Sequence, residues 1–178
     1  GSAIVTVSGG QLPLTYLWDD PNTQITNTAT GLCAGYHSVQ VTDFNNCSIT
    51  DSILVPFQDT TSQSICLITV DTLSQYNIVV WEKPITNLID SFYIYRNIVG
   101  AYTKVGAVSY DSLSQFIDTT NGVNPNITSF RYKISSLDTC GYETALSNFH
   151  ETIHLTVSSA GGNIKNLIWD NYEGFSFV

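Results

Sequence analysis

The four cysteines of this sequence are the residues whose chemistry is most directly readable. Cys33, Cys47, Cys66 and Cys140 form none of the CxxC pairs that are typical of zinc sites and thiol redox motifs. An even number of cysteines in a β-rich, lysine-poor chain predicts two disulfide bonds and an oxidising compartment, with four buried free thiols as the alternative. Cys33 and Cys47 flank an expected strand at 36–43, and we expect the tight return of that strand to bring them within bonding distance. Four cysteines allow three connectivities, so the pairing stays open.

Three aspartates are candidate calcium ligands. Asp19 and Asp20 lie close to Asn22, and Asp43 lies close to Asn45, which together supply the hard oxygen atoms that calcium prefers. Neither cluster has the spacing of an EF-hand, and tight turns use the same residue types. The alternatives are therefore a weak calcium site or two ordinary turns. A glycosidase needs two acids across a groove, and neighbouring acids in one turn do not predict such a groove.

The histidines and serines do not predict a catalytic or metal centre. His150 and His154 enclose Glu151 and would point the same way along a strand, but no third ligand is near in the sequence. A solvated boundary between modules is the simpler interpretation of this pair. The GxSxG signature of a serine nucleophile is missing from the sequence. We therefore expect no cofactor, no metal and no enzymatic activity.

Tyrosines are abundant in the middle of the chain and are candidates for a sugar-binding surface. Tyr93, Tyr95, Tyr102 and Tyr110 lie on or near expected strands. Rows of exposed aromatic rings can bind carbohydrate, but period-two alternation sends about half of such residues into a core. A glycan site is thus the functional alternative to plain packing.

The elements that must position these residues are predicted to be β-strands. Apolar residues alternate with period two or form short blocks between turn residues, and no helical periodicity persists. Only 12% of the 178 residues are charged, and Thr, Ser, Asn and Gln supply the polarity. The net charge of −9 argues against nucleic acid and anionic lipid as partners. No stretch approaches the roughly 20 apolar residues that would insert into a membrane.

Residues 1–56 read as one small module with turns every 8 to 15 residues. "VSGGQLPLTYLWDD" and "ATGLCAGYHSVQVTDFNNCSIT" resemble a SprB-type repeat, whose pattern is V-S-G-G-x-P-P-Y-x-Y-x-W followed by G-L-x-A-G-x-Y-x-V-x-V-x-D-x-x-G-C. The resemblance covers nearly all of residues 5–50. Trp18 and Tyr36 are expected in its core. Asn46 departs from the usual Gly, but Asn also enters the left-handed region.

The SprB-type resemblance implies an immunoglobulin-like or PKD-like sandwich in a tandem array. Such repeats belong to large surface adhesins of gliding or biofilm-forming Bacteroidota that are exported by the type IX system. The resemblance therefore implies a secreted, cell-surface location.

After a polar linker at 57–64, residues 65–152 resemble a bacterial fibronectin type III module. The resemblance rests on "VVWEKP", "IDSFYIYR", "QFIDTT" and "FRYKISSLDTCGYETALS". It implies that Trp81 is the core tryptophan and that Tyr132 is a corner tyrosine whose hydroxyl bonds to nearby backbone. It also implies that Cys66 and Cys140 can meet at one end of the sandwich. Because each module holds an even pair of cysteines, we expect one disulfide within each module.

Residues 153–178 echo the start of the preceding module. "IHLTVSSAGGNIKNLIWDNYEGFSFV" matches "CLITVDTLSQYNIVVWEKPITNLIDSFYIY", with Trp169 in the place of Trp81. Two or three strands cannot close a sandwich, so we expect the first strands of a further, truncated module. The alternative is that this segment pairs with a neighbouring chain or module.

The predicted fold is all-β, with tandem immunoglobulin-like antiparallel sandwiches. The predicted function is a non-catalytic structural or adhesive region of a large secreted bacterial surface protein. Its expected partners are neighbouring modules, other copies of itself, and a surface or glycan ligand. A glycan-binding accessory module of a secreted enzyme is the alternative function.

Overall fold

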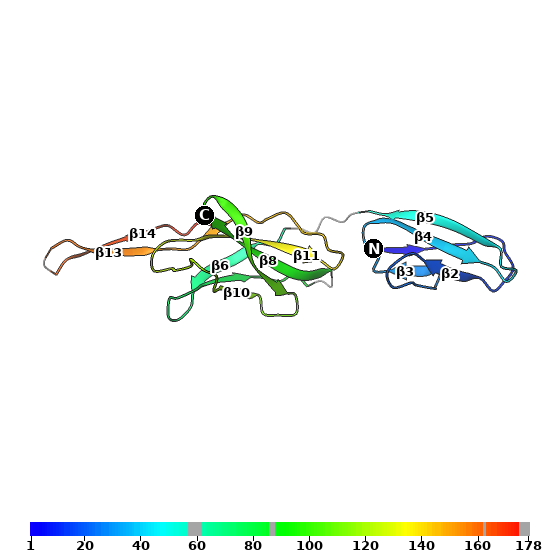
Figure 1. Ribbon diagram of the computed structural model, residues 1–178, viewed down its shortest axis with the longest axis horizontal. Coiled ribbons are helices and arrows are strands. Elements are labelled where there is room, and N and C mark those ends of the chain that lie inside the picture. Colours follow the sequence, from blue (N-terminus) through cyan, green and yellow to red (C-terminus); the bar gives the residue numbers. More distant parts are fainter. Residues whose placement is uncertain (57–61, 86–87, 162, 175–178) are drawn as a thin grey trace. The chain divides into compact units, whose positions relative to one another are not determined.

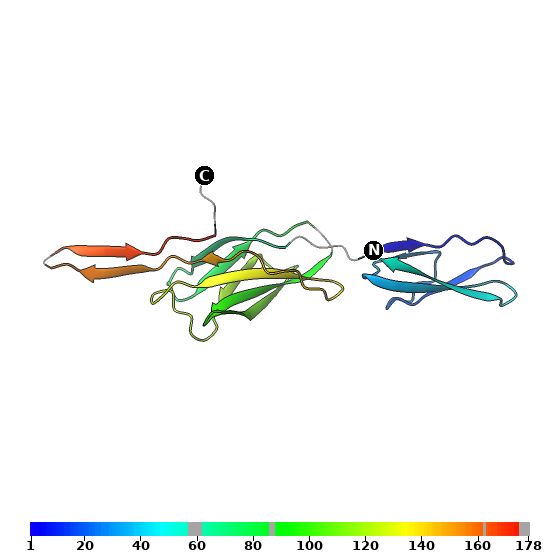
Figure 2. The ribbon, with the colours of Figure 1, turned by 90° about the horizontal axis from the view of Figure 1, so that it is seen from above.

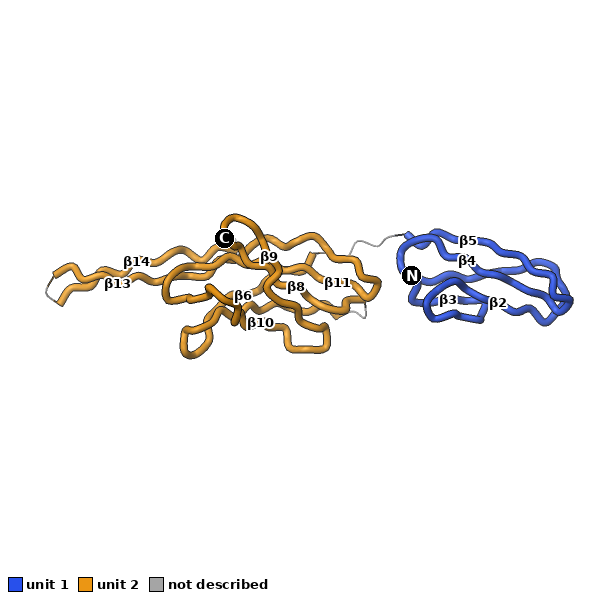
Figure 3. Tube along the Cα trace, viewed as in Figure 1, with its two compact units in different colours: residues 1–59 blue, residues 60–178 orange. Residues whose placement is uncertain are grey.

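The computed structural model describes residues 1–56, 62–85, 88–161 and 163–174, and every regular element in these ranges is a β-strand (Figure 1). The predicted all-β class is confirmed, because antiparallel sheets pack into immunoglobulin-like sandwiches. The chain divides into two compact units, residues 1–59 and 60–178 (Figure 3). Their boundary falls inside the range predicted as a linker, of which residues 57–61 lie outside the described ranges.

The first unit packs a two-stranded sheet against a three-stranded one (Figure 2). β1 (Ser2–Ile4) pairs with β3 (Thr28–Thr30). β2 (Thr15–Trp18), β4 (Gly35–Thr42) and β5 (Ser48–Val55) form the second sheet in the order β2-β4-β5. The buried apolar residues of this unit are Trp18, Ala29, Leu32, Val39, Val41 and Val55.

The core tryptophan of this unit, Trp18, is 2% exposed and donates from its indole nitrogen to the carbonyl oxygen of Thr26 at 2.9 Å. The prediction that Tyr36 also lies in the core is wrong, because 75% of Tyr36 is exposed. Side chains alternate along β4, and Tyr36 is three residues from the buried Val39, which places the two on opposite faces. Asn46 adopts a φ of 64°, so the expected left-handed turn residue is confirmed.

The second unit is a sandwich of a three-stranded and a four-stranded sheet. β6 (Ile65–Val70), β7 (Asn77–Trp81) and β10 (Gln115–Asp118) form the order β10-β7-β6. Trp81, from the end of β7, is 2% exposed and its ring lies 5.3 Å from that of Phe92 in the opposite sheet. Aromatic packing between the sheets therefore anchors this core.

The four-stranded sheet has the order β12-β11-β8-β9. Its strands are β8 (Ile89–Ile98), β9 (Ala101–Ser109), β11 (Arg131–Asp138) and β12 (His150–Glu151). All neighbours in the sheet are antiparallel. The buried apolar residues of the whole unit are Ile65, Ile68, Val79, Trp81, Ile89, Phe92, Ile94, Tyr132 and Ile134.

A separate hairpin follows this sandwich. β13 (Leu155–Ser159) pairs with β14 (Lys165–Trp169), and Figures 1 and 2 both show the hairpin extending away from the packed sheets of its unit. Trp169 is 60% exposed, so the prediction that it is a core residue is wrong. The reason is that no second sheet covers the hairpin in the part of the chain that the structure describes. The prediction of a further module at 153–178 stays a prediction.

The segment after the hairpin returns to the sandwich. Glu173 forms an antiparallel bridge with Glu151 of β12. The hydroxyl of Tyr172 lies 2.7 Å from Nδ1 of His150 and accepts a hydrogen bond from the backbone N–H of Ile68. Gly174 lies so close to the His150 ring that a Cβ atom at position 174 would be 2.4 Å from it. Both ends of the hairpin are therefore attached to the second unit.

Candidate functional site

Aromatic and basic side chains gather on the outer face of the four-stranded sheet. Alternation along β8 sends Phe92 into the core and turns Tyr93 and Tyr95 outward. The register places Lys104 of β9 on one side of Tyr95 and Lys133 of β11 on the other. Neighbouring strands therefore alternate rings and cations on this face.

The cations of this outer face lie over the aromatic rings. The ammonium nitrogen of Lys104 is 3.8 Å from the ring centroid of Tyr93, and that of Lys133 is 4.8 Å from the centroid of Tyr102. These are cation–π contacts, which hold the lysines in place but also cover ring surface that a sugar would stack on. The face can therefore offer hydroxyl and ammonium donors to a polar or acidic ligand.

Tyr95 is fixed as a hydrogen-bond donor. Its hydroxyl donates to Oε1 of Glu143 at 2.6 Å, and Ser135 donates to the same oxygen. Burial and, secondarily, this carboxylate raise the pKa of Tyr95 to about 12. The phenol therefore stays protonated throughout the physiological range.

Of the four tyrosines singled out in the sequence, Tyr93, Tyr95 and Tyr102 share this face. Tyr110 does not, because its ring stacks on the buried Phe92 at a centroid distance of 6.2 Å and its hydroxyl donates to the carbonyl of Pro84. Sequence reasoning missed the lysines of this face. Strand alternation in the sequence could show only that these lysines face outward. The pairing of the strands decides which tyrosines they lie beside, and the sequence alone does not give that pairing.

The calcium candidate Asp20 is a turn residue whose oxygen atoms are already engaged. Its carboxylate accepts hydrogen bonds from the backbone N–H groups of Asn22 and Gln24, each at 3.0 Å, and from the side-chain amide of Gln24 at 2.9 Å. The bonds from Gln24 are the main cause that lowers the pKa of Asp20 below its usual value. Asp20 therefore stabilises this turn by accepting its hydrogen bonds, as Asp commonly does.

The other two calcium candidates lie apart from each other. Asp43 closes the β4–β5 turn, where backbone N–H groups of Gln11, Asn45 and Cys47 donate to it and lower its pKa. Asp19 directly follows β2, where the hydroxyl of Ser38 in the middle of β4 donates to it at 2.8 Å. That bond is the largest cause that lowers the pKa of Asp19. The three carboxylates therefore do not converge on one ion.

His150, Glu151 and His154 have separate structural roles. His150 is buried against Tyr172, and burial lowers its pKa. Glu151 accepts from Nε of Arg131 at 2.8 Å, while Nε2 of His154 lies 3.1 Å from the carbonyl oxygen of Asn126. The structure does not bring the two imidazoles to a common point, and within its described ranges it groups no three His, Cys, Asp or Glu residues as a metal site.

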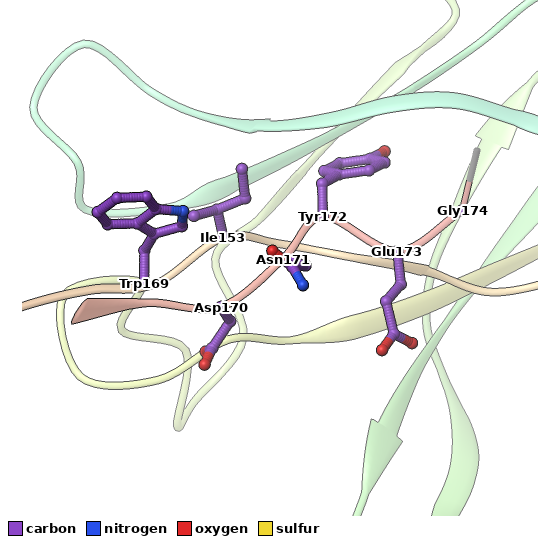
Figure 4. A pocket seen from close by; sticks show the side chains of 7 residues that line it. All are labelled: Ile153, Trp169, Asp170, Asn171, Tyr172, Glu173 and Gly174. Atoms are coloured by element: carbon purple, nitrogen blue, oxygen red, sulfur yellow. The ribbon is translucent and has the colours of Figure 1, made fainter. Parts of the chain in front are cut away.

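A cavity of about 630 Å³ lies where the hairpin joins the sandwich (Figure 4). Trp169, Ile153 and Tyr172 point to one side of the chain and Asp170 and Glu173 to the other. Glu173 also lies 3.7 Å from a guanidinium nitrogen of Arg131. The cavity is lined by Ile153, Trp169, Asp170, Asn171, Tyr172, Glu173 and Gly174.

A buried polar network joins the two sheets of the second unit. Nη1 of Arg96 lies 2.7 Å from Oδ2 of Asp118, and the Tyr132 hydroxyl donates to the same oxygen at 2.8 Å. Asn77 donates to the Tyr132 hydroxyl at 3.0 Å, and the Thr120 hydroxyl donates to the other oxygen of Asp118. Arg96 is 5% exposed, and Asp118 and Tyr132 are fully buried. The network is closed to substrates and connects β8 and β11 to β7 and β10.

The network corrects one expectation about Tyr132. Its hydroxyl bonds to the side chain of Asp118, fourteen residues upstream, and not to nearby backbone. The buried Arg96 explains this choice, because an acid is needed to balance its charge and the acid offers a stronger acceptor than a carbonyl. Burial raises the pKa of Tyr132 above the ordinary tyrosine value, so its hydroxyl remains a donor.

The predicted disulfide within the first unit is wrong. Cys33 is disulfide-bonded, whereas Cys47 has a free, exposed thiol. The two cysteines lie at opposite ends of β4. At one end, Gly35 pairs with Val55, and Cys33 comes just before this pair. At the other end, Thr42 pairs with Ser48, and Cys47 lies in the turn between them. Eight strand residues at about 3.3 Å each separate the two ends by roughly 26 Å, far more than a disulfide spans.

The predicted Cys66–Cys140 bond is also wrong. Cys140 is disulfide-bonded, and Cys66 has a free, exposed thiol. The ladder of β6 shifts register between Ile65 and Leu67, and Cys66 is the residue at the irregularity. Because Ile65 and Ile68 face the core, Cys66 is turned outward, away from the sheet that carries β11. A disulfide in this chain is nevertheless present, which is typical of an oxidising, extracellular setting.

Comparisons with known proteins leave the family open. No family model matches the chain, and no curated protein matches it. Among solved structures, a β-1,2-glucanase from Parabacteroides distasonis is 10% identical over 78% of this chain and 25% of its own, with a TM-score of 0.42. The FN1–FN3 domains of chicken CNTN1 are 14% identical over 78% of this chain and 55% of theirs, also with a TM-score of 0.42. This chain thus spans a quarter and about half of these two structures, and at this similarity neither bears on its function.

Proposed function

We propose that this chain is a non-catalytic structural and adhesive region of a large secreted bacterial cell-surface protein. The observation that carries the proposal is the use of its ionisable side chains. Arg96 and Asp118 are buried between two sheets, and Asp20 and Asp43 each accept several backbone hydrogen bonds in turns. These ionisable side chains, of the kinds that a catalytic site would use, therefore stabilise the folded modules.

The disulfide and the sandwich architecture support the same proposal. A disulfide outside the cell limits unfolding, and small sandwiches with short polar connections suit a spacer that holds a ligand-binding part away from a cell. In the described ranges we find no helix that is long and apolar enough to cross a membrane. Adhesion would then arise from many modules that act together.

The test is attachment under flow. Beads coated with the oxidised chain are passed over polysaccharide, protein-coated and bare surfaces, and chain that has been reduced and heat-denatured serves as the control. We expect attachment to at least one surface and its loss with the denatured chain. A chain that attaches to none of them, but turns over a glycoside or peptide substrate in a purified assay, would refute the proposal.

One observation favours a second candidate function, a glycan-binding accessory module. It is the gathering of Tyr93, Tyr95 and Tyr102 with two lysines on one sheet face. A glycan array probed with the chain tests this function. Binding that is lost in Lys104→Ala and Tyr102→Ala, but retained in the control Tyr76→Ala, supports it, and equal signals from all variants exclude this face.

A further inference from the structure

We propose that the β13–β14 hairpin of one copy of this chain packs on strand β5 of a second copy, so that copies associate head to tail. The proposal rests on the structural function above and names its partner as the chain itself. It joins two apolar faces, one in each unit, that the fold leaves uncovered.

The first of these surfaces is one side of the hairpin, which we call the donor face. The register pairs Leu155 with Trp169 and Val157 with Leu167, and directly paired residues share a face of the sheet. These four side chains are between 52% and 60% exposed. A contiguous apolar face of this kind on a soluble chain is typical of a contact surface.

The donor face has the pattern of a hairpin that is buried elsewhere in the same chain. In β6–β7, Ile65 pairs with Trp81 and Ile68 pairs with Val79, and all four are at most 4% exposed under the four-stranded sheet. In each hairpin, two cross-strand apolar pairs share one face, and the pair farther from the turn includes a tryptophan. The donor face is therefore built to lie against the apolar side of another sheet.

The second surface lies on β5 and is called the acceptor face. β5 is the edge strand of its sheet, and its Ile49 and Ile53 are 69% and 51% exposed. Ile49 pairs with Val41, and Asp51 pairs with Val39, both of which are buried. The face of the sheet that points to the core therefore extends onto β5. The two-stranded β1–β3 sheet that covers this face at β4 leaves Ile49 and Ile53 exposed.

Charge complementarity selects the donor face as the occupant. Asp51 lies between Ile49 and Ile53 on the acceptor face, and residues 1–59 contain no lysine or arginine that could pair with it. Lys165 lies on the donor face, where it donates to the hydroxyl of its cross-strand partner Ser159 at 2.7 Å. Across the described ranges, no carboxylate lies within ion-pairing distance of Lys165.

The spacing of the two faces agrees as well. Lys165 and Leu167 are two residues apart on β14, and Asp51 and Ile49 are two residues apart on β5. Each pair spans about 6.6 Å along its strand, so one ion pair and one apolar contact form together. Because the two faces belong to different parts of the chain, the contact is heterologous and can propagate.

The size of the contact sets its strength. Four apolar side chains and one ion pair form a smaller surface than the about 800 Å² per partner of a stable complex. We therefore expect reversible, concentration-dependent association between free chains. When many copies are held close together on one surface, the same weak contact becomes persistent.

The test reverses the charges. Sedimentation velocity is measured over a concentration series after the thiols of Cys47 and Cys66 are blocked, so that new disulfides do not contribute. We expect the wild type to associate, and Asp51→Lys and Lys165→Asp each to weaken association about tenfold through like-charge repulsion. The double variant with both reversals should recover the wild-type behaviour.

A mixing experiment identifies the head-to-tail geometry. The Asp51→Lys chain keeps an intact donor face, and the Lys165→Asp chain keeps an intact acceptor face. An equimolar mixture should therefore associate like the wild type, because each donor face then meets an acceptor face of opposite charge on the other variant, whereas either variant alone associates about tenfold more weakly. Thr50→Lys and Asn166→Asp serve as matched controls, because both residues lie on the opposite faces of the same strands.

Three results would overturn the proposal. A wild type that stays monomeric at every concentration excludes the contact. Single charge reversals that associate like the wild type, or controls that weaken association equally, exclude these two faces. The attachment assay under flow is independent of these measurements, so loss of self-association does not by itself refute the structural function.

Discussion

At the scale of single residues, the second unit depends on a balanced charge in its interior. The guanidinium of Arg96 and the carboxylate of Asp118 are removed from water, which is tolerated only when their hydrogen bonds are complete. Tyr132 supplies one of the donors to Asp118, and Thr120 supplies another. Deleting one donor should therefore cost more than its own bond, because it leaves a buried carboxylate lone pair unpaired.

Removing the phenol hydroxyl tests this directly. We expect Tyr132→Phe to lower the free energy of unfolding of the second unit by about 1–3 kcal/mol, since a buried acceptor loses its partner while the ring still packs. Urea denaturation measures the change. Tyr76→Phe is the matched control in the same unit, because Tyr76 is exposed, and its effect should be close to zero. Equal stability of the two variants would contradict the role of the network.

The turn carboxylates make the first unit sensitive to acid. Hydrogen bonds from Gln24 lower the pKa of Asp20 below the ordinary 3.8. A carboxyl group with a depressed folded pKa stabilises the fold above its unfolded pKa, and that contribution is lost as pH falls through the folded pKa. The melting temperature of the first unit should therefore drop below about pH 4. Asp20→Asn should flatten this dependence and lower stability at neutral pH, and thermal unfolding over a pH series measures both effects.

At the scale of elements, the two sheets of the second unit meet at a glycine. A Cβ atom at Gly106 of β9 would lie 2.1 Å from the ring of Phe116 on β10. β9 and β10 belong to different sheets, so the bare backbone at Gly106 lets the ring fill the space between them. The reason for this glycine is close packing, since its φ lies outside the left-handed region.

A methyl group at that position should force the sheets apart. We expect Gly106→Ala to destabilise the second unit by about 1–3 kcal/mol, the usual cost of overpacking. Thermal unfolding followed by circular dichroism measures the loss. In the Phe116→Leu background the smaller side chain leaves room, so the same alanine should cost much less. An additive double variant would show that Phe116 is not the obstacle.

At the scale of the whole molecule, the two units have separate cores and the chain carries a net charge of −9. Its cysteines differ in state, with Cys33 and Cys140 disulfide-bonded and Cys47 and Cys66 free and exposed. In such a chain the two bonded sulfurs are already oxidised, and the two exposed thiols are accessible to modification.

Alkylation of the native chain checks this assignment. Iodoacetamide applied without reductant should label Cys47 and Cys66 within minutes to hours, and it should label Cys33 and Cys140 only after reduction. Mass spectrometry of tryptic and chymotryptic peptides reads out each site. Labelling of all four residues without reductant, or of none, would contradict the assignment.

Sequence reasoning reached the class of fold and many of its turns. It failed where two residues had to be placed in space. Tyr36 was expected in the core although its spacing from Val39 puts it on the other face, and Cys33 was paired with Cys47 although a full strand separates them. Alternation and rise per residue would have corrected both predictions.

The sequence by itself determined that this chain is all-β, because period-two alternation between turn residues is incompatible with helices. It also determined the positions of core residues such as Trp18 and Trp81, whose large apolar side chains end amphipathic strands. Only the tertiary structure decided that Arg96, Asp118 and Tyr132 meet, that Lys104 lies over Tyr93, and which thiols remain free. Those contacts depend on strand order and register, which are set by packing between residues far apart in the chain.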